Sequence, residues 1–127
     1  MNILDTSSIF NLFRRGKYTE ILDNATIPLA IYEVGNVLWK NSNVKNTISK
    51  EEAKDIGSVL FELINSIEQV IPTWSSVLSL ALTEGLTFYD SSFLGASIER
   101  GYGLITDDIK LFRIASIRIA VKMTKDL

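Results

Sequence analysis

The order of apolar and polar positions along the chain predicts short strands that alternate with helices. Apolar runs of strand length lie at residues 1–4, 25–27, 70–72, 104–106 and 117–121. Between most of these runs, apolar residues recur every three or four positions, which is the spacing of a helix with one buried face. Strands that alternate with helices are typical of an α/β domain with a parallel sheet.

Residues that begin and end helices support this division. Short polar side chains follow residue 4, Pro28 suits the first turn of a helix, and Ser49 and Glu52 have the spacing of a capping box. Gly85 and Gly101 suit the ends of two later helices. We therefore expect helices over about residues 6–14, 28–40, 50–67, 75–84 and 88–100, a polar loop at 41–47, and a short helix around 111–112.

The length and composition are those of one globular domain. No repeat, low-complexity tract or linker divides the 127 residues, so we expect a single domain over residues 1–127. The chain is 46% hydrophobic and 22% charged, which is globular rather than disordered. No apolar run approaches the ~20 residues of a membrane span, and the first residues lack the charge of a targeting segment. We therefore expect a cytoplasmic protein without a membrane partner.

Two residue types are absent, and their absence limits the chemistry. Without cysteine, the chain has no disulfide, thiol nucleophile or thiolate metal site. Without histidine, it has no imidazole acid–base group, Ser-His-Asp triad or histidine-ligated metal. The net charge of −2 means that any surface for nucleic acid must be local. Catalysis by this chain must therefore use carboxylates, hydroxyls, amines or a hard cation.

Four acidic residues stand out by their positions. Asp5 follows the first strand, Asp108 follows the strand at 104–106, and Asp90 lies at the start of a helix. In a parallel sheet, Asp5 and Asp108 emerge at the carboxyl ends of strands, where open α/β sheets bind ligands. Glu33 lies at the edge of the apolar face of its helix rather than on the solvated side.

Each acid alone has an ordinary explanation, since aspartate often caps helices and Glu33 could pair with a lysine. Capping does not explain why a semi-buried glutamate accompanies three such aspartates. Carboxylates a few ångströms apart repel one another, and a divalent hard cation with oxygen ligands removes that penalty. We therefore expect Mg²⁺ or Mn²⁺ at this cluster, and a phosphodiester or phosphoester as substrate.

Four segments, LDTSSIF, YEVGNVLWK, FYDSSFLGAS and LITDDIKLF, give the chain its resemblance to a known family. In this order and spacing they resemble the PIN-domain ribonucleases, especially the VapC-type toxins of prokaryotic toxin–antitoxin pairs. The resemblance runs from Asp5 to the last strand. It implies a three-layer α/β/α sandwich around a parallel sheet of about five strands.

Matched residue by residue, the resemblance assigns the site. The family's four acids match Asp5, Glu33, Asp90 and Asp108, which are expected to be catalytic and to hold the metal ion. Supporting roles are expected for the hydroxyls of Ser7 and Thr106, for the amide of Asn36, and for Asp107 as an outer-shell or alternate ligand. In an extended chain, Thr106 and Asp108 share one face and Asp107 points the other way.

The activity that the resemblance implies is endoribonuclease cleavage of a structured RNA, such as transfer or ribosomal RNA, with Mg²⁺ or Mn²⁺ as cofactor. The implied partners are a cognate antitoxin that covers the acids and a second copy of the chain in a homodimer. RNA contact near the acids requires positive charge, for which the basic residues within 14–17 and 110–113 are candidates. Phe88 and Tyr89 are interpreted as core residues rather than base-stacking platforms, and Trp39 and Trp74 as either core or interface residues.

Two other functions remain open from the residues alone. A binding module could keep the fold without cleaving RNA. A phosphotransferase could use an aspartyl-phosphate, but Ser7 stands where a haloacid-dehalogenase-like enzyme needs a second aspartate, and a receiver-like domain needs an acidic pair where only Asp5 occurs. Manganese-dependent cleavage that Asp5→Asn abolishes would distinguish the nuclease from the binding module, and a fluoride–metal mimic that marks a covalent aspartate would favour the phosphotransferase.

Overall fold

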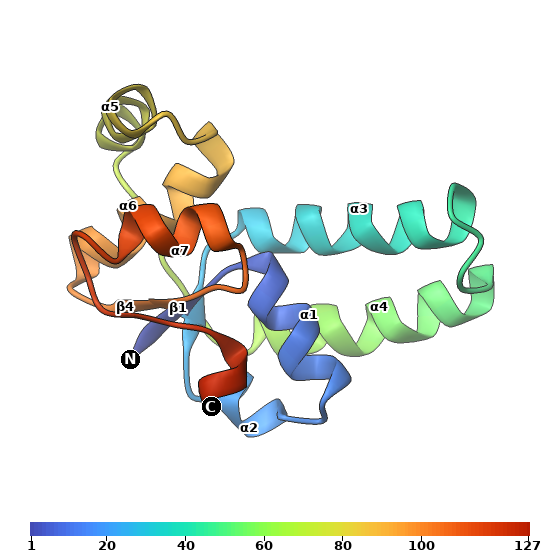
Figure 1. Ribbon diagram of the computed structural model, residues 1–127. Helices are drawn as coiled ribbons and strands as arrows, with labels where there is room; N and C mark the ends of the chain where they lie inside the picture. Colours follow the sequence, from blue (N-terminus) through green and yellow to red (C-terminus); the bar gives the residue numbers. More distant parts are fainter.

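A five-stranded parallel sheet forms the centre of the computed structural model, which describes residues 1–127 (Figure 1). The strand order is β3-β2-β1-β4-β5, so the chain starts in the middle of the sheet and extends it on both sides. The strands are β1 (Asn2–Leu4), β2 (Ala25–Thr26), β3 (Glu68–Gln69), β4 (Gly103–Ile105) and β5 (Val121–Lys122). The predicted α/β fold with a parallel sheet of about five strands is confirmed.

Two of the predicted strands are displaced along the sequence. The third was expected at 70–72, but β3 pairs with β2 through Glu68 and Gln69, and the Ile71 side chain is 67% exposed. The fifth was expected at 117–121, but backbone bonds of residues 117–119 to 114 and 115 form turns that follow α7 (Ile109–Ala115). Apolar character was a poor guide here, because the pairing partner fixes which residues of a short segment join the ladder.

The remaining helices are close to the predicted ones. They are α1 (Thr6–Arg14), α2 (Tyr18–Leu22), α3 (Leu29–Asn43), α4 (Lys50–Asn65), α5 (Trp74–Glu84) and α6 (Phe88–Arg100), and a 3-10 turn, η1, covers Thr124–Asp126. Helix α2 was not predicted; it is five residues long and has no side-chain cap. Helix α3 continues into the predicted loop as far as Asn43, and Ser42 in this last turn is only 9% exposed.

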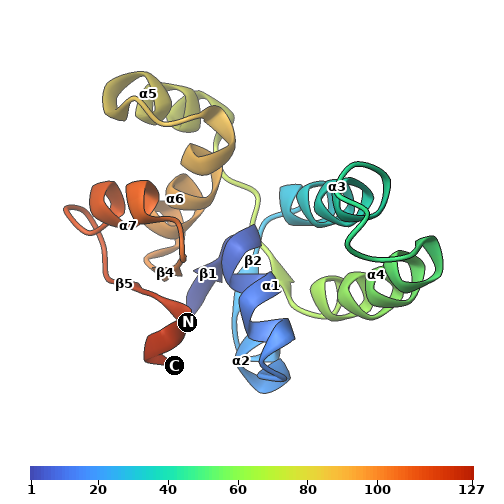
Figure 2. The same cartoon turned by 45° about the vertical axis from the view of Figure 1, so that its right-hand side comes forward.

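The helices lie on either side of the sheet. Figure 2 shows α3 and α4 as a pair on one side, and α5, α6 and α7 grouped on the other. Ile3 and Leu4 of the central strand have no exposed surface and belong to a buried apolar cluster that joins the sheet to the helices. None of the helices combines the length and hydropathy needed to cross a bilayer.

The predicted capping box at the start of α4 forms as expected. The Ser49 hydroxyl accepts from the Glu52 N–H at 3.0 Å, and the Glu52 carboxylate accepts from the Ser49 N–H at 3.0 Å. We predict that Ser49→Ala lowers the free energy of unfolding by about 1 kcal/mol, because a backbone donor loses its partner. Urea denaturation measures this. Ser58→Ala, an exposed change inside the same helix, is the control, and an equal loss in both variants would contradict the prediction.

Candidate active site

Asp5 lies where β1 ends and α1 begins, and its carboxylate is almost fully hydrogen-bonded. Oδ1 accepts from the Ser8 N–H at 2.9 Å and from the Ser7 hydroxyl at 2.8 Å, while Oδ2 accepts from the Thr106 hydroxyl. The side chain is held rigidly, since Asp5 is only 6% exposed. A carboxylate oxygen accepts about two bonds, so Oδ2 keeps one free position for a further ligand.

The residues after β4 are tied to the same place. The Thr106 hydroxyl accepts from the Asp108 N–H at 3.1 Å, and the Ser7 hydroxyl accepts from the Asp107 N–H at 3.1 Å. Asp108 caps α7 by accepting from the Leu111 N–H at 2.9 Å, and its side chain is exposed. The two hydroxyls that orient Asp5 therefore also fix the backbone that carries Asp108.

The other two acids come from helices. Glu33 on α3 is half-buried and accepts from the Thr6 hydroxyl at 2.7 Å. Asp90 lies in the first turn of α6, whose cap residue Thr87 accepts from the Asp90 N–H at 3.1 Å. No group of the protein donates a hydrogen bond to the carboxylate of Asp90, so nothing nearby except Lys110 offsets its charge.

The charges of all four acids meet at Asp90. Burial, together with the negative charges of Asp108, Asp5 and Glu33, raises the pKa of Asp90 to about 6, while the positive charge of Lys110 opposes the shift. The structure therefore brings the four predicted acids within electrostatic range of one another. Lys110 offsets only part of their repulsion, because the pKa of Asp90 remains raised.

Burial acts on the other two inner acids as well. It raises the pKa of Asp5, against the hydrogen bonds from Thr106, Ser8 and Ser7 that favour the charged form. It also raises the pKa of Glu33, where the Thr6 hydroxyl opposes the shift and the charge of Asp5 adds to it. For each of these acids, burial raises the free energy of the ionised form, and a bound cation would offset that penalty.

The chemistry of this cluster fits a hard divalent cation. Its donors are carboxylate and hydroxyl oxygens, and the chain has no histidine or cysteine to offer a softer ion. No group of three or more acidic side chains is arranged closely enough to hold one metal ion as the side chains stand. The acids thus interact electrostatically, but their side chains are not arranged as a metal-binding site.

Two of the expected supporting residues form no hydrogen bond with the four acids through their side chains. Asn36 is exposed, and its side chain forms no hydrogen bond. The carboxylate of Asp107 turns away from Asp5 and accepts bonds from Asn11 and Thr124. These bonds outweigh burial and lower the pKa of Asp107. Ser7 and Thr106, in contrast, contact Asp5 directly.

Sequence reasoning missed several residues that shape the site. Thr6 donates a hydrogen bond to Glu33, and the only sign of this role in the sequence is the position of Thr6 in the polar run after β1.

Phe88 and Tyr89 are 39% and 58% exposed, so their interpretation as core residues was wrong. Trp39 and Trp74 are each 53% exposed, which excludes both from the core.

The basic candidates differ in their surroundings. Arg15 donates to Thr124 and Lys17 to the Leu127 carbonyl, so both are engaged within the protein. Lys110 donates to the Gly85 carbonyl at 3.3 Å. Arg14 is exposed and lines a groove of about 380 Å³ together with Thr6, Ser7, Phe10, Asn11 and Val37. Among the basic residues at 14–17, Arg14 is thus the one whose side chain forms no hydrogen bond within the protein, and it lies in the same groove as Thr6 and Ser7.

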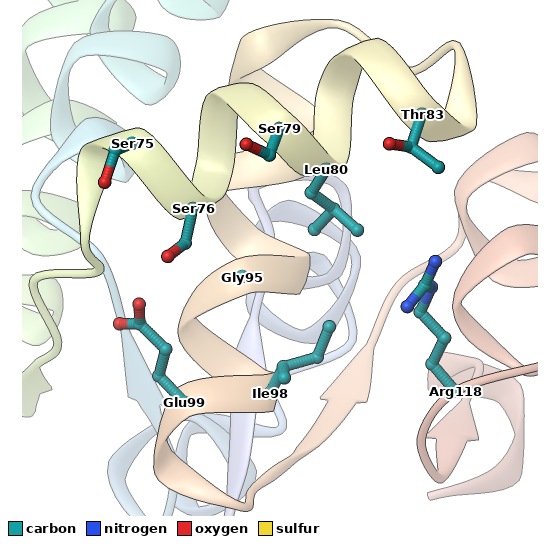
Figure 3. Close-up of a pocket in the computed structure, with 9 residues that line it drawn as sticks. All are labelled: Ser75, Ser76, Ser79, Leu80, Thr83, Gly95, Ile98, Glu99 and Arg118. Carbon is teal, nitrogen blue, oxygen red and sulfur yellow. The ribbon is translucent and has the colours of Figure 1, made fainter.

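A larger groove lies between α5 and α6 and contains none of the four acids. Figure 3 shows its lining, with Arg118 at one end, and its volume is about 520 Å³. The Glu99 carboxylate in this groove accepts from the Thr73 N–H, and Arg118 pairs with Glu84. Its charged groups are therefore already partnered, and the acid cluster is the better candidate site.

The chain is similar in sequence to two curated proteins of Pyrobaculum aerophilum. It is 33% identical to Exonuclease VapC9 over 89 residues, which is 68% of this chain and 63% of that protein, so the match spans less than two thirds of VapC9. It is 28% identical to Ribonuclease VapC3 over 121 residues, which is 86% of this chain and 90% of that protein. No family model matches the chain.

Two solved structures have the same fold. The crystal structure of PAE2754 from Pyrobaculum aerophilum matches with a TM-score of 0.83 at 24% identity, covering 98% of this chain and 91% of that one. The structure of VapBC-1 from nontypeable Haemophilus influenzae matches with a TM-score of 0.62 at 14% identity, covering 98% of each chain. Together, the related sequences and the shared fold show that the chain belongs to the VapC-type PIN-domain proteins.

Proposed function

We propose that the domain formed by residues 1–127 is a Mg²⁺- or Mn²⁺-dependent endoribonuclease and the toxin of a VapBC-type toxin–antitoxin pair. The observation that carries the proposal is the electrostatic one: burial and the charges of three neighbouring carboxylates raise the pKa of Asp90 to about 6. Oxygen donors of this kind would suit a hard cation, and hard cations such as Mg²⁺ and Mn²⁺ assist hydrolysis of phosphodiesters. The names of the relatives VapC9 and VapC3, an exonuclease and a ribonuclease, support a nuclease.

The residues have distinct roles in this proposal. Asp5, Asp90, Asp108 and Glu33 would hold the metal ion, which when bound would stabilise charge on a phosphoryl oxygen and lower the pKa of a water molecule. Asp5 offers the free position on Oδ2, while Thr106 fixes the orientation of its carboxylate. Asp90 has no competing hydrogen-bond donor, so its oxygens are available to the ion.

The proposed substrate is a structured RNA such as transfer or ribosomal RNA. An acidic cluster repels the RNA backbone, so positive charge must lie beside it. Arg14 supplies such a charge in the groove that it shares with Thr6 and Ser7, and Lys110 supplies another beside Asp90.

The proposed partners are a cognate antitoxin and a second copy of the chain, in the cytoplasm. The similarity in fold to VapBC-1 supports an antitoxin partner. An exposed apolar stripe on α5 supports contact with a protein: Trp74, Leu78 and Leu82 recur every four residues and are 53%, 50% and 78% exposed. Apolar side chains gathered on one helix face in this way often mark protein interfaces.

The central test is cleavage of RNA by the purified chain freed of any inhibitor. With Mn²⁺ present, we expect cleavage of a structured transfer RNA and of a circular RNA, which has no end for an exonuclease. We predict that Asp90→Asn lowers the rate by about 100-fold or more, because a charged oxygen at the reacting centre is lost. Asp55→Asn, on the exposed face of α4, is the matched control.

The other outcomes are equally informative. Cleavage of linear RNA alone would make the chain an exonuclease, as the name of VapC9 would suggest. Binding of Mn²⁺ by calorimetry without any cleavage would favour the silent binding module. A fluoride–metal phosphate mimic attached at an aspartate would favour the phosphotransferase.

The repulsion at Asp90 also predicts that removing the charge of this side chain stabilises the folded protein. The ordinary pKa of aspartate is 3.8 and burial with repulsion raises that of Asp90 to about 6, so the folded chain loses stability as the pH rises between these values. In the metal-free protein, Asp90→Asn should therefore raise the free energy of unfolding by roughly 1–2 kcal/mol at pH 7.5, allowing for solvent screening. This gain should disappear at about pH 3, where Asp90 is protonated in both the folded and the unfolded state.

Urea denaturation in EDTA at the two pH values measures the difference between variant and wild type. Asp55→Asn should show no gain at pH 7.5. An Asp90→Asn protein no more stable than wild type at pH 7.5 would mean that the four carboxylates are not crowded.

The role proposed for Arg14 has its own test. We predict that Arg14→Ala weakens RNA binding in EDTA for every RNA sequence, and that the slope of log K against log salt decreases by about 1, because one phosphate contact is lost. Fluorescence anisotropy at several salt concentrations measures both. Lys45→Ala, in the loop between α3 and α4, is the control, and an equal effect there would show that the contact is not specific to the groove.

A further inference from the structure

Asp107, between two residues of the site, is bound on the side away from Asp5. Its Oδ2 accepts from Asn11 Nδ2 at 2.6 Å and from the Thr124 hydroxyl at 2.6 Å, and its Oδ1 accepts from the Thr124 N–H at 2.8 Å. The carboxylate therefore joins the loop after β4 to α1 and to the 3-10 turn η1. This use of the oxygens leaves one accepting position, on Oδ1.

Thr124 is the centre of this network. It is 1% exposed, and its hydroxyl accepts from Arg15 Nη1 at 2.9 Å while donating to Asp107. Lys17 also donates to the Leu127 carbonyl, which adds a second tie between the region after α1 and η1. Turn η1 is thus fastened to the loop by a buried side chain whose hydrogen-bonding groups are all used.

The other side of the same loop is bound to Asp5. The Asp107 N–H donates to the Ser7 hydroxyl and the Asp108 N–H to the Thr106 hydroxyl, and both hydroxyls donate to the Asp5 carboxylate. Residues 106–108 therefore lie between two sets of hydrogen bonds, one to the acid site and one to η1. Asp108 itself is exposed, and apart from its own helix cap it depends on this loop for its position.

We propose that Thr124 and Asp107 form an anchor that positions Asp108 and Asp5 to bind the metal ion. Thr124 is a positioning residue in this arrangement, acting through Asp107 rather than at the reacting atoms. The consequence for metal binding rests on the proposed function, whereas the effect of the anchor on the loop does not. Losing an outer partner of a metal ligand typically costs 10- to 100-fold in affinity, so the anchor should be measurable.

The test compares Thr124→Val, which removes the hydroxyl, with Thr124→Ser, which keeps it. Thr47→Val makes the same change at an exposed hydroxyl in the loop between α3 and α4. The first measurement is amide hydrogen exchange at residues 107 and 108 in the metal-free protein, with Leu60 in α4 as internal reference. The second is the affinity for Mn²⁺ by calorimetry.

We expect Thr124→Val to speed exchange at residues 107 and 108 by roughly 10-fold, the effect of losing about one hydrogen bond, without changing Leu60. We expect it to weaken Mn²⁺ binding by about 10-fold. Thr124→Ser and Thr47→Val should behave as wild type in both measurements. If Thr124→Val does not fold, Asn11→Ala removes a different donor to Asp107 and should give the same two changes.

Unchanged exchange at residues 107 and 108 would overturn the anchor. Faster exchange with unchanged Mn²⁺ affinity would also overturn it, because the loop would then be loosened without effect on the ligands. Wild-type protein that binds no Mn²⁺ would overturn the proposed function, and with it the assignment of the anchor to metal binding.

Discussion

Crowded negative charge at the carboxyl ends of β1 and β4 is the constraint on which the site depends. Three of the carboxylates lie at helix starts and one in a helix interior, and the charges of Asp5, Glu33 and Asp108 all act on Asp90. A folded protein can hold such a cluster only if other interactions compensate, since like charges near one another disfavour the folded state. The pairing of β1 with β4 in the parallel sheet brings Asp5 and Asp108 to the same edge of the sheet even though their charges repel one another.

Short hydroxyl side chains make this arrangement specific. Ser7 and Thr106 both donate to Asp5 and both accept from backbone groups of the loop that carries Asp108. Thr6, between Asp5 and Ser7, instead turns to Glu33 on α3. The start of α1, helix α3 and the loop after β4, which lie far apart in the sequence, are thus joined by one set of hydrogen bonds. A hydroxyl suits this role because it donates to a carboxylate and accepts from a backbone N–H at the same time.

Local signals allowed much of the fold to be predicted from the sequence. The capping box at Ser49 and the left-handed glycines at Gly85 and Gly101 are formed by neighbouring residues, so sequence spacing determines them. The positions of β3 and β5 were wrong because two-residue strands take their register from a partner far along the chain. Helix α2 carries neither a cap nor a long periodic stretch, which leaves no local signal to detect.

The candidate site shows the same division between local and distant information. Asp107 and Asp108 are identical side chains in adjacent positions, and the family resemblance, supported by the alternation of an extended chain, distinguished them beforehand. The physical difference between them comes from residues on other elements: Thr124, 17 positions away, and Asn11, 96 positions away, occupy the carboxylate of Asp107. Asp108 has no such partner beyond its helix cap, so its second oxygen stays available. The hydrogen bonds from Asn11 and Thr124 hold the carboxylate of Asp107 away from the site, and this leaves Asp108 as the aspartate that is available there.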